Sequence, residues 1–112
     1  TYPGIHAQIL TNLITNSVRH GFNDMDDNQI IINLAKQNNI VEVHYQDNGI
    51  GLSEEVQKHI FDPFFTTARQ SGGVGLGMSI VYNLITQKLA GKIFIDKNSS
   101  GACFIYQFKE SA

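Results

Sequence analysis

The sequence predicts an α+β protein, a two-layer α/β sandwich in which a mixed, mainly antiparallel sheet carries helices on one face. Two long stretches, residues 5–20 and 76–89, have apolar residues at helical spacing. Each is followed by a pair of short apolar runs joined by a polar turn, which is typical of antiparallel hairpins. A length of 112 residues supports one hydrophobic core, so residues 1–112 are expected to form a single domain.

The first helix is expected over residues 5–20, after Pro3 and Gly4 and ending at Gly21. Residues at helical spacing, two of them small, are expected to form its buried face: Leu10, Leu13, Ile14, Ser17, Val18 and Gly21. Residues 22–28 are acidic and rich in turn formers, so they predict a surface loop.

Two strands, residues 29–36 and 40–46, are rich in Ile and Val and are expected to pair through the polar turn at 37–39. A short helix over residues 54–60 should follow. Ser53 is able to cap it, and the acidic residues of its first turn suit the positive end of the helix dipole.

Residues 62–75 lose all periodicity and contain a glycine-rich run, which indicates a long functional loop. The second long helix is expected over 76–89, with Gly91 as its stop. Two closing strands, residues 92–97 and 102–108, are expected to meet at a turn of Asn, Ser and Gly.

Composition excludes several classes of function. A formal net charge of −2 argues against the basic footprint that binding to nucleic acid or an anionic membrane needs. The single cysteine, Cys103, cannot form a disulfide or a Cys-based zinc site within the chain and is expected to be a buried thiol. The apolar stretches are too short to span a membrane and no signal peptide opens the chain, so a cytoplasmic location is expected.

Polar residues on the first helix form the first candidate site. Asn12, Asn16, Arg19 and His20 are expected to share one stripe opposite the apolar face. An Asn amide oxygen is a hard neutral ligand that suits Mg²⁺, and Arg19 would then be able to reach a phosphate. Taken alone, the same stripe is more often a solvated polar face.

Two further segments carry candidate residues. Asp47 stands at a predicted strand end, where its carboxylate would be able to accept a hydrogen bond from an exocyclic amine such as that of adenine. Gly49 and Gly51 would allow the ring to approach closely, although a plain Asn-Gly turn is an equal alternative. The aromatic cluster at 61–65 either hinges a mobile loop or anchors that loop in the core.

The glycine-rich run at 72–77 opens directly into the second long helix, where backbone N–H groups and the helix dipole favour a phosphate chain. It lacks the Gly-Lys-Ser/Thr ending of a P-loop, and Ile80 stands where the dinucleotide fingerprint has its third glycine. Taken alone, a flexible linker is an equal alternative.

Together and in order, four segments resemble the N, G1, F and G2 boxes of sensor histidine kinases: 12–20 (NLITNSVRH), 47–51 (DNGIG), 61–65 (FDPFF) and 73–77 (GVGLG). The resemblance covers nearly the whole chain and implies the Bergerat fold of the gyrase, Hsp90 and histidine kinase superfamily. It implies ATP and Mg²⁺ as ligands, with Asn16 as the metal ligand, Asn12 close by, and Asp47 as the residue that reads adenine. The other nucleotide-binding residues that it implies are Arg19, His20, Gly49, Gly51, Phe64, Arg69, Gly73, Gly75, Leu76 and Gly77.

The resemblance also implies an activity, the transfer of the γ-phosphate of ATP to a histidine, with Asn12, Asn16 and Arg19 as catalytic residues. Asn12 stands where the ATPases of the superfamily have a glutamate that activates water, and an amide cannot accept a proton in that role. None of the four histidines has an acceptor context, so the acceptor is expected on a dimerisation hairpin upstream. The implied partners are that hairpin and a response regulator. The parent would be a homodimer that can be anchored in the inner membrane, and this piece would be a monomer.

Three other functions share these boxes: a nucleotide-binding regulatory module without transfer, an anti-sigma-type serine kinase, and a free-standing ATPase. Departures from the family pattern bear on the first. Val74 and Ala102 replace threonines and remove two hydroxyl contacts, so nucleotide binding is expected to be weaker. Ser17 stands where alanine is commoner, and this change is expected to be silent.

Overall fold

The computed structural model describes residues 3–22, 26–63, 77–97 and 99–110. Its helices and strands, in chain order, are α1 (Pro3–Asn16), η1 (Ser17–Gly21), β1 (Ile30–Gln37), β2 (Ile40–Asp47), α2 (Glu54–His59), α3 (Gly77–Asn83), η3 (Leu84–Lys88), β3 (Lys92–Ile95) and β4 (Cys103–Lys109). The predicted order of elements is therefore confirmed. Among the described residues, no helix has the length and hydrophobicity needed to cross a bilayer.

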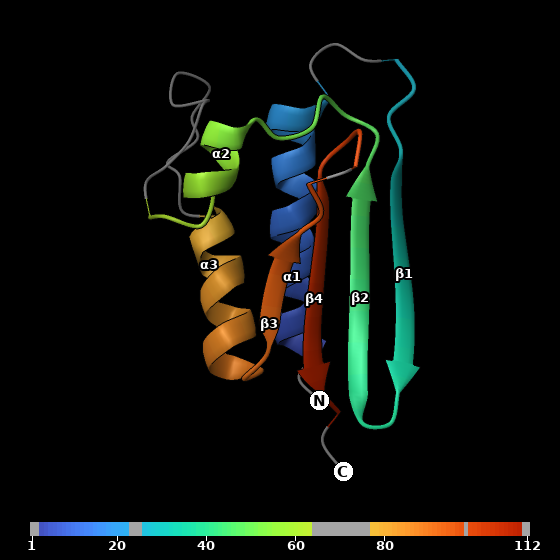
Figure 1. Ribbon diagram of the computed structural model, residues 1–112, viewed down its shortest axis with the longest axis vertical. Helices are drawn as coiled ribbons and strands as arrows, with labels where there is room; N and C mark the ends of the chain where they lie inside the picture. Colours follow the sequence, from blue (N-terminus) through green and yellow to red (C-terminus); the bar gives the residue numbers. More distant parts are fainter. Residues whose placement is uncertain (1–2, 23–25, 64–76, 98, 111–112) are drawn as a thin grey trace.

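The four strands form one sheet in the order β1-β2-β4-β3, and each neighbouring pair is antiparallel. The mainly antiparallel sheet is confirmed, and no parallel pair occurs among the described strands. The turn between β1 and β2 places Asn38 in the left-handed region, at a φ of 58°, where asparagine is well tolerated. Figure 1 shows the sheet in front with α1 behind it, and α3 beside α1.

The core lies between the sheet and the helices. Alternate residues of β2 and β4 point toward the helix layer, because side chains alternate between the two faces of a strand. They meet apolar residues of α1, α3 and η3, and the largest buried side chains of this layer are Ile9, Leu13, Tyr45, Val81, Ile85, Phe104 and Tyr106. Burial raises the pKa of Tyr106 to about 12, so this hydroxyl stays protonated.

Both long helices change from α to π geometry near their carboxyl ends, which the periodicity did not predict. In η1 the N–H of Phe22 donates to the carbonyl of Ser17 at 3.0 Å, and in η3 that of Leu89 donates to Leu84 at the same distance. The expected stop of the second helix is also displaced. Ala90, at a φ of 51°, takes the left-handed position, and the N–H of Gly91 closes the helix by donating to a carbonyl in η3.

The predicted buried face of the first helix is partly wrong. The residues that are buried form one line at intervals of four: Ile9, Leu13, Ser17 and Gly21. Leu10 is half-buried, whereas Ile14 and Val18 are exposed. Each of these two is the residue directly after a member of the buried line, so it lies further round the helix, where α3 and the sheet do not cover it.

The short helix α2 follows its predicted signals. The Ser53 hydroxyl accepts a hydrogen bond from the N–H of Val56 at 3.1 Å, which is the expected cap. The helix ends at His59, one residue before the predicted end. It leads into Phe61, whose ring lies 5.3 Å from that of Tyr82 on α3 and 6.3 Å from that of Phe104. Phe61 therefore anchors this segment against the core.

We predict that Leu13→Ala lowers the free energy of unfolding by about 2–5 kcal/mol, because it opens a cavity between α1 and the sheet. The matched control is Val18→Ala on the same helical stretch, which should change stability by less than about 1 kcal/mol because this side chain is 61% exposed. Urea denaturation followed by circular dichroism measures both. Equal losses for the two variants would contradict the observed burial.

Candidate functional site

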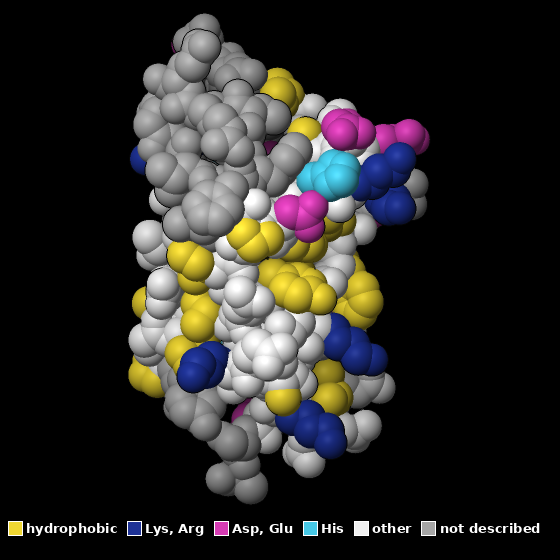
Figure 2. Space-filling model, turned by 90° about the vertical axis from the view of Figure 1, so that its left-hand side faces the viewer, with side chains coloured by type: hydrophobic (Ala, Val, Ile, Leu, Met, Phe, Trp, Pro, Cys, Tyr) yellow, Lys and Arg dark blue, Asp and Glu magenta, His cyan; other side chains and the backbone are white. Residues whose placement is uncertain are grey.

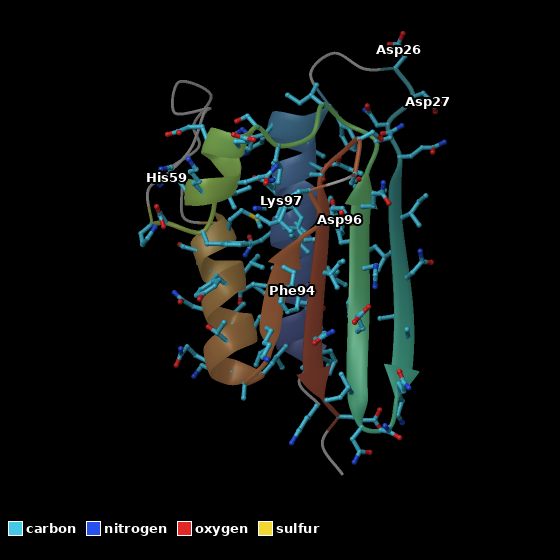
Figure 3. The ribbon with its side chains drawn as sticks, viewed as in Figure 1. Asp26, Asp27, His59, Phe94, Asp96 and Lys97 are labelled. Atoms are coloured by element: carbon cyan, nitrogen blue, oxygen red, sulfur yellow. The ribbon has the colours of Figure 1, made fainter. Side chains whose placement is uncertain are left out.

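The candidate residues that the structure describes gather at one end of the sandwich. The carboxyl ends of β2 and of the first helical stretch, the start of β4 and the start of α3 all lie toward this end (Figure 1). Asp26 and Asp27 lie at its outer margin, above β1, as Figure 3 shows. Both chain termini lie at the opposite end, so the candidate site is remote from them.

Asp47 is the buried polar centre of this end, with 2% of its surface exposed. Its Oδ1 accepts hydrogen bonds from the N–H groups of Gly49 at 3.0 Å and Ala102 at 2.9 Å. Its Oδ2 accepts one from the hydroxyl of Ser17 at 2.7 Å. Three separate segments therefore donate to a single carboxylate, which satisfies a charge that would otherwise be costly to bury.

Glycine is required where these segments touch. A Cβ on Gly49 would lie 2.3 Å from the carbonyl oxygen of Gly21, and one on Gly101 would lie 2.0 Å from that of Asp47. The N–H of Ile50 donates to the same Gly21 carbonyl at 2.9 Å, which joins the loop after β2 to the end of η1. Backbones therefore meet directly around the carboxylate, with no room for side chains.

The segment after Asp47 is more than a plain Asn-Gly turn. The side chain of Asn48 accepts from the N–H of Gln29 at 2.8 Å and donates to the carbonyl of Asp27 at 2.6 Å. It therefore ties the loop after β2 to the chain that enters β1. Gly51 has a φ of 80°, a conformation that glycine favours. No local pattern predicts this role of Asn48, because its partners are 19 and 21 residues away in the chain.

Asn12 and Gly77 come together across the α1–α3 contact. A Cβ built on Gly77 would lie 4.0 Å from Oδ1 of Asn12. The Nδ2 of Asn12 is buried and has no hydrogen-bond partner, which is so for no other buried side-chain nitrogen or oxygen in the part of the chain described. An unpaired buried amide is costly, and a bound ion or ligand that completes it is one explanation for it. This asparagine therefore has the unfilled capacity that a polar ligand would use.

Asn16, Arg19 and His20 lie further along the same helical stretch. Asn16 is half-buried and ends α1, whereas Arg19 is exposed and His20 is half-buried within η1. A single stripe of Asn12, Asn16, Arg19 and His20 requires α geometry throughout, and the helix has this geometry only as far as Asn16. Burial lowers the pKa of His20 below its ordinary value, and the neighbouring Arg19 guanidinium lowers it further. The imidazole is thus neutral at pH 7, and the positive charge here belongs to Arg19.

Ser17 differs from its sequence-based expectation, whereas Ala102 lacks the hydroxyl as expected and keeps a backbone contact. Ser17, expected to be a silent replacement for alanine, is buried and bonds both to Asp47 and, at 2.7 Å, to the hydroxyl of Tyr45. Ala102 lacks a hydroxyl, but its N–H donates to the same carboxylate. No local signal identifies Ser17 as a site residue, since Ser17 lies in η1 and its partners lie on β2.

Five of the expected nucleotide-binding residues lie outside the described residues: Phe64, Arg69, Gly73, Gly75 and Leu76. In the ranges that are described, no group of three His, Cys, Asp or Glu side chains is placed to hold a metal ion. A metal here would need Asn ligands and oxygens from a bound molecule. On the α2 and α3 side, hydrophobic side chains lie below a group of acidic side chains and a histidine (Figure 2).

Comparisons with known proteins show the family and the fold. The sequence model of the family described as histidine kinase-, DNA gyrase B-, and HSP90-like ATPase matches residues 4–112. The sensor histidine kinase GlnK of Bacillus subtilis is 33% identical over 104 residues, which cover 88% of this chain and 25% of GlnK. The chain spans a quarter or less of the length of the curated relatives it matches.

Solved structures have the same fold. The catalytic domain of the histidine kinase ThkA superposes with a TM-score of 0.79 at 31% identity, covering 96% of this chain and 67% of that one. ThkA in complex with the response regulator protein TrrA superposes with a TM-score of 0.71 at 29% identity, covering 93% and 28%.

We predict that Gly49→Ala destabilises the protein by about 1–3 kcal/mol, since its methyl group would overlap the Gly21 carbonyl. The matched control is Gly4→Ala, because a Cβ on Gly4 would meet nothing within 4 Å. Gly4→Ala should be neutral or slightly stabilising in its helical position. Thermal unfolding of both variants tests this, and a Gly49→Ala protein as stable as the wild type would contradict the close contact.

Proposed function

Because the chain belongs to the histidine kinase-, DNA gyrase B-, and HSP90-like ATPase family, as the catalytic ATP-binding domain of a histidine kinase, we propose that it binds Mg-ATP and donates the γ-phosphate to a histidine on a separate dimerisation hairpin. The observation that carries the proposal is that residues of two motifs, 47–51 and 73–77, both contact the helical stretch that holds the motif at 12–20. Asn12 meets Gly77, Ser17 meets Asp47, and Gly21 meets Gly49. No sequence spacing requires this convergence.

The base end of the proposed site is the Asp47 carboxylate. A carboxylate whose position is fixed by three donors presents its remaining lone pair in one direction, which suits an exocyclic amine. Gly49 and Gly51 let the loop beside the carboxylate pack directly against the backbone at Gly21 and Ser100, which fixes this loop at the base end of the proposed site. In this proposal Asp47 recognises adenine by accepting a hydrogen bond from its exocyclic amine.

The phosphate end is proposed to lie toward the start of α3. From Ser17 to Asn12 the helix rises by about 7.5 Å, which separates the two ends on the scale of a nucleotide. Gly77, beside Asn12, begins α3, and its positive dipole end favours phosphate. The other residues proposed to border the phosphates are Arg19, His20, Phe64, Arg69, Gly73, Gly75 and Leu76.

Asn16 is proposed to hold Mg²⁺, with Asn12 beside it. Amide oxygens fit this role, because they are hard ligands that leave the full charge of the ion for phosphate oxygens. The unpaired buried Nδ2 of Asn12 is a hydrogen-bond donor, so it would be satisfied by a phosphate oxygen of the bound nucleotide and not by the cation. Bound Mg²⁺ would neutralise charge on the phosphates.

In the proposed reaction an imidazole nitrogen attacks the γ-phosphorus, the bond to the β–γ bridging oxygen breaks, and ADP leaves. The domain contributes by orienting the phosphates for in-line transfer. Asn12 cannot act as a base toward water, so hydrolysis is not assisted at this position. This absence supports transfer over ATP turnover.

Partners follow from this reaction. We propose that the hairpin belongs to the same protein, that the parent is a homodimer acting in the cytoplasm, and that this domain alone is a monomer. ThkA has been solved in complex with a response regulator, which supports a response regulator as the downstream acceptor.

We predict that Asp47→Asn lowers the affinity for ATP by at least about 100-fold, because the amide replaces the charged acceptor with a neutral group that has a donor of its own. Isothermal titration with a non-hydrolysable ATP analogue measures the change. Asp26→Asn, at the outer margin of this end, is the matched control and should leave affinity unchanged. An Asp47→Asn protein that is folded and binds normally would rule out the assignment.

We predict that the domain, mixed with a separately made hairpin and labelled Mg-ATP, labels the acceptor histidine. Asn16→Ala should slow transfer by about 100- to 1,000-fold, since it removes charge stabilisation at the phosphates. Thr11→Ala, an exposed position on the same helix, should transfer normally. ATP binding without any label on the hairpin would refute transfer and favour a regulatory module.

A further inference from the structure

Two buried hydroxyl groups, those of Ser17 and Tyr45, are hydrogen-bonded in series to Asp47. Ser17 is 2% exposed and Tyr45 is fully buried. The two hydroxyl oxygens are 2.7 Å apart, and the Tyr45 hydroxyl also donates to the carbonyl of Leu13 at 3.1 Å. This series therefore links the carboxylate to the backbone of α1. Nothing in the phosphotransfer scheme uses it.

The directions of these hydrogen bonds follow from counting protons. Ser17 has one hydroxyl proton, and it goes to Asp47 because an ionised carboxylate is a stronger acceptor than a phenol oxygen. Burial raises the pKa of Tyr45 above its ordinary value, so Tyr45 keeps its own proton. That proton is shared between the Ser17 oxygen and the Leu13 carbonyl. Ser17 thus donates its proton to Asp47, and its oxygen accepts a hydrogen bond from the Tyr45 hydroxyl.

The lone pairs of the carboxylate can be counted in the same way. Each oxygen accepts about two hydrogen bonds. Oδ1 already accepts two, from the N–H groups of Gly49 and Ala102. Oδ2 accepts one from Ser17, so among the described residues it keeps one unused position. The open acceptor of this buried group is therefore on the atom that Ser17 holds.

We propose that Ser17 is a positioning residue that determines base specificity: its hydroxyl holds Asp47 so that the free lone pair of Oδ2 meets an exocyclic amine on the bound base. The proposal rests on the proposed function of ATP binding at this site. At position 102 an alanine replaces the threonine of the family pattern, so only its N–H contacts the carboxylate. The Ser17 hydroxyl supplies a side-chain hydroxyl contact in its place. Bases that carry a carbonyl or only hydrogen at this place would gain nothing from the open acceptor.

A structural role for Ser17 would give a different result, and base discrimination separates the two. If the hydroxyl only satisfied buried groups, its loss would weaken the binding of every nucleotide alike. If it positions Oδ2, its loss would weaken only nucleotides that have the amine. The informative quantity is thus the ratio of two affinities, which a general loss of stability does not change.

The test compares a non-hydrolysable analogue of ATP with the matching analogue of purine riboside triphosphate, which lacks the amine, in calorimetric titrations of the whole chain with Mg²⁺. The wild type should prefer the ATP analogue by about 10- to 100-fold. In Ser17→Ala this preference should fall about three- to tenfold, with affinity for the amine-free analogue unchanged. Thr15→Ala, an exposed hydroxyl on the same helix, is the matched control and should keep the full preference.

An unchanged preference in folded Ser17→Ala would overturn the proposal, even if both affinities fell together. If thermal unfolding shows that Ser17→Ala does not fold, Tyr45→Phe decides: it keeps the buried ring but removes the proton that holds Ser17. It should lower the same preference, and an unchanged preference would overturn the proposal. A wild-type protein that binds neither nucleotide would instead refute the proposed function itself.

Discussion

The buried charge of Asp47 is the constraint on which the rest of this end depends. A carboxylate with almost no exposed surface is tolerated only when donors surround it, and here they come from η1, from the loop after β2 and from the start of β4. These segments become neighbours only when the helix layer is packed on the sheet. Folding of the core and assembly of the site are thus one event, and the glycines at 49 and 101 are the sterically necessary result.

The first helical stretch packs against the core with one side and carries candidate site residues on another. One line of residues at intervals of four packs between α3 and the sheet, while Asn12 and Asn16 sit at its half-buried margin. A margin position gives an amide a fixed direction and limited contact with water. Such a position can leave a polar atom unpaired: the buried Nδ2 of Asn12 has no hydrogen-bond partner among the described residues. An unsatisfied polar atom held on a rigid element would suit the ligand proposed for this site.

Local patterns predicted the fold closely because each element is encoded within a few residues. Apolar runs rich in Ile and Val, with polar turns between them, placed all four strands to within two residues at their ends, and Ser53 capped α2 as expected. The errors have physical causes. Periodicity cannot tell which of two adjacent helical lines a neighbour will cover, so Ile14 and Val18 were wrongly placed in the core. It also assumes α geometry, so it could not predict the π turns that reorient Arg19 and His20.

The sequence by itself determined the family, the order of the elements and the residues that carry the four motifs, because those motifs are short and contiguous. Only the tertiary structure decided how they meet. The hydrogen bonds of Asp47 join residues 30 and 55 positions apart in the chain, from Ser17 and Ala102. Their existence depends on the register of β2 against β4 and on the packing of η1 over both. No local spacing encodes that geometry, so a serine that looked neutral in the sequence proves to touch the centre of the site.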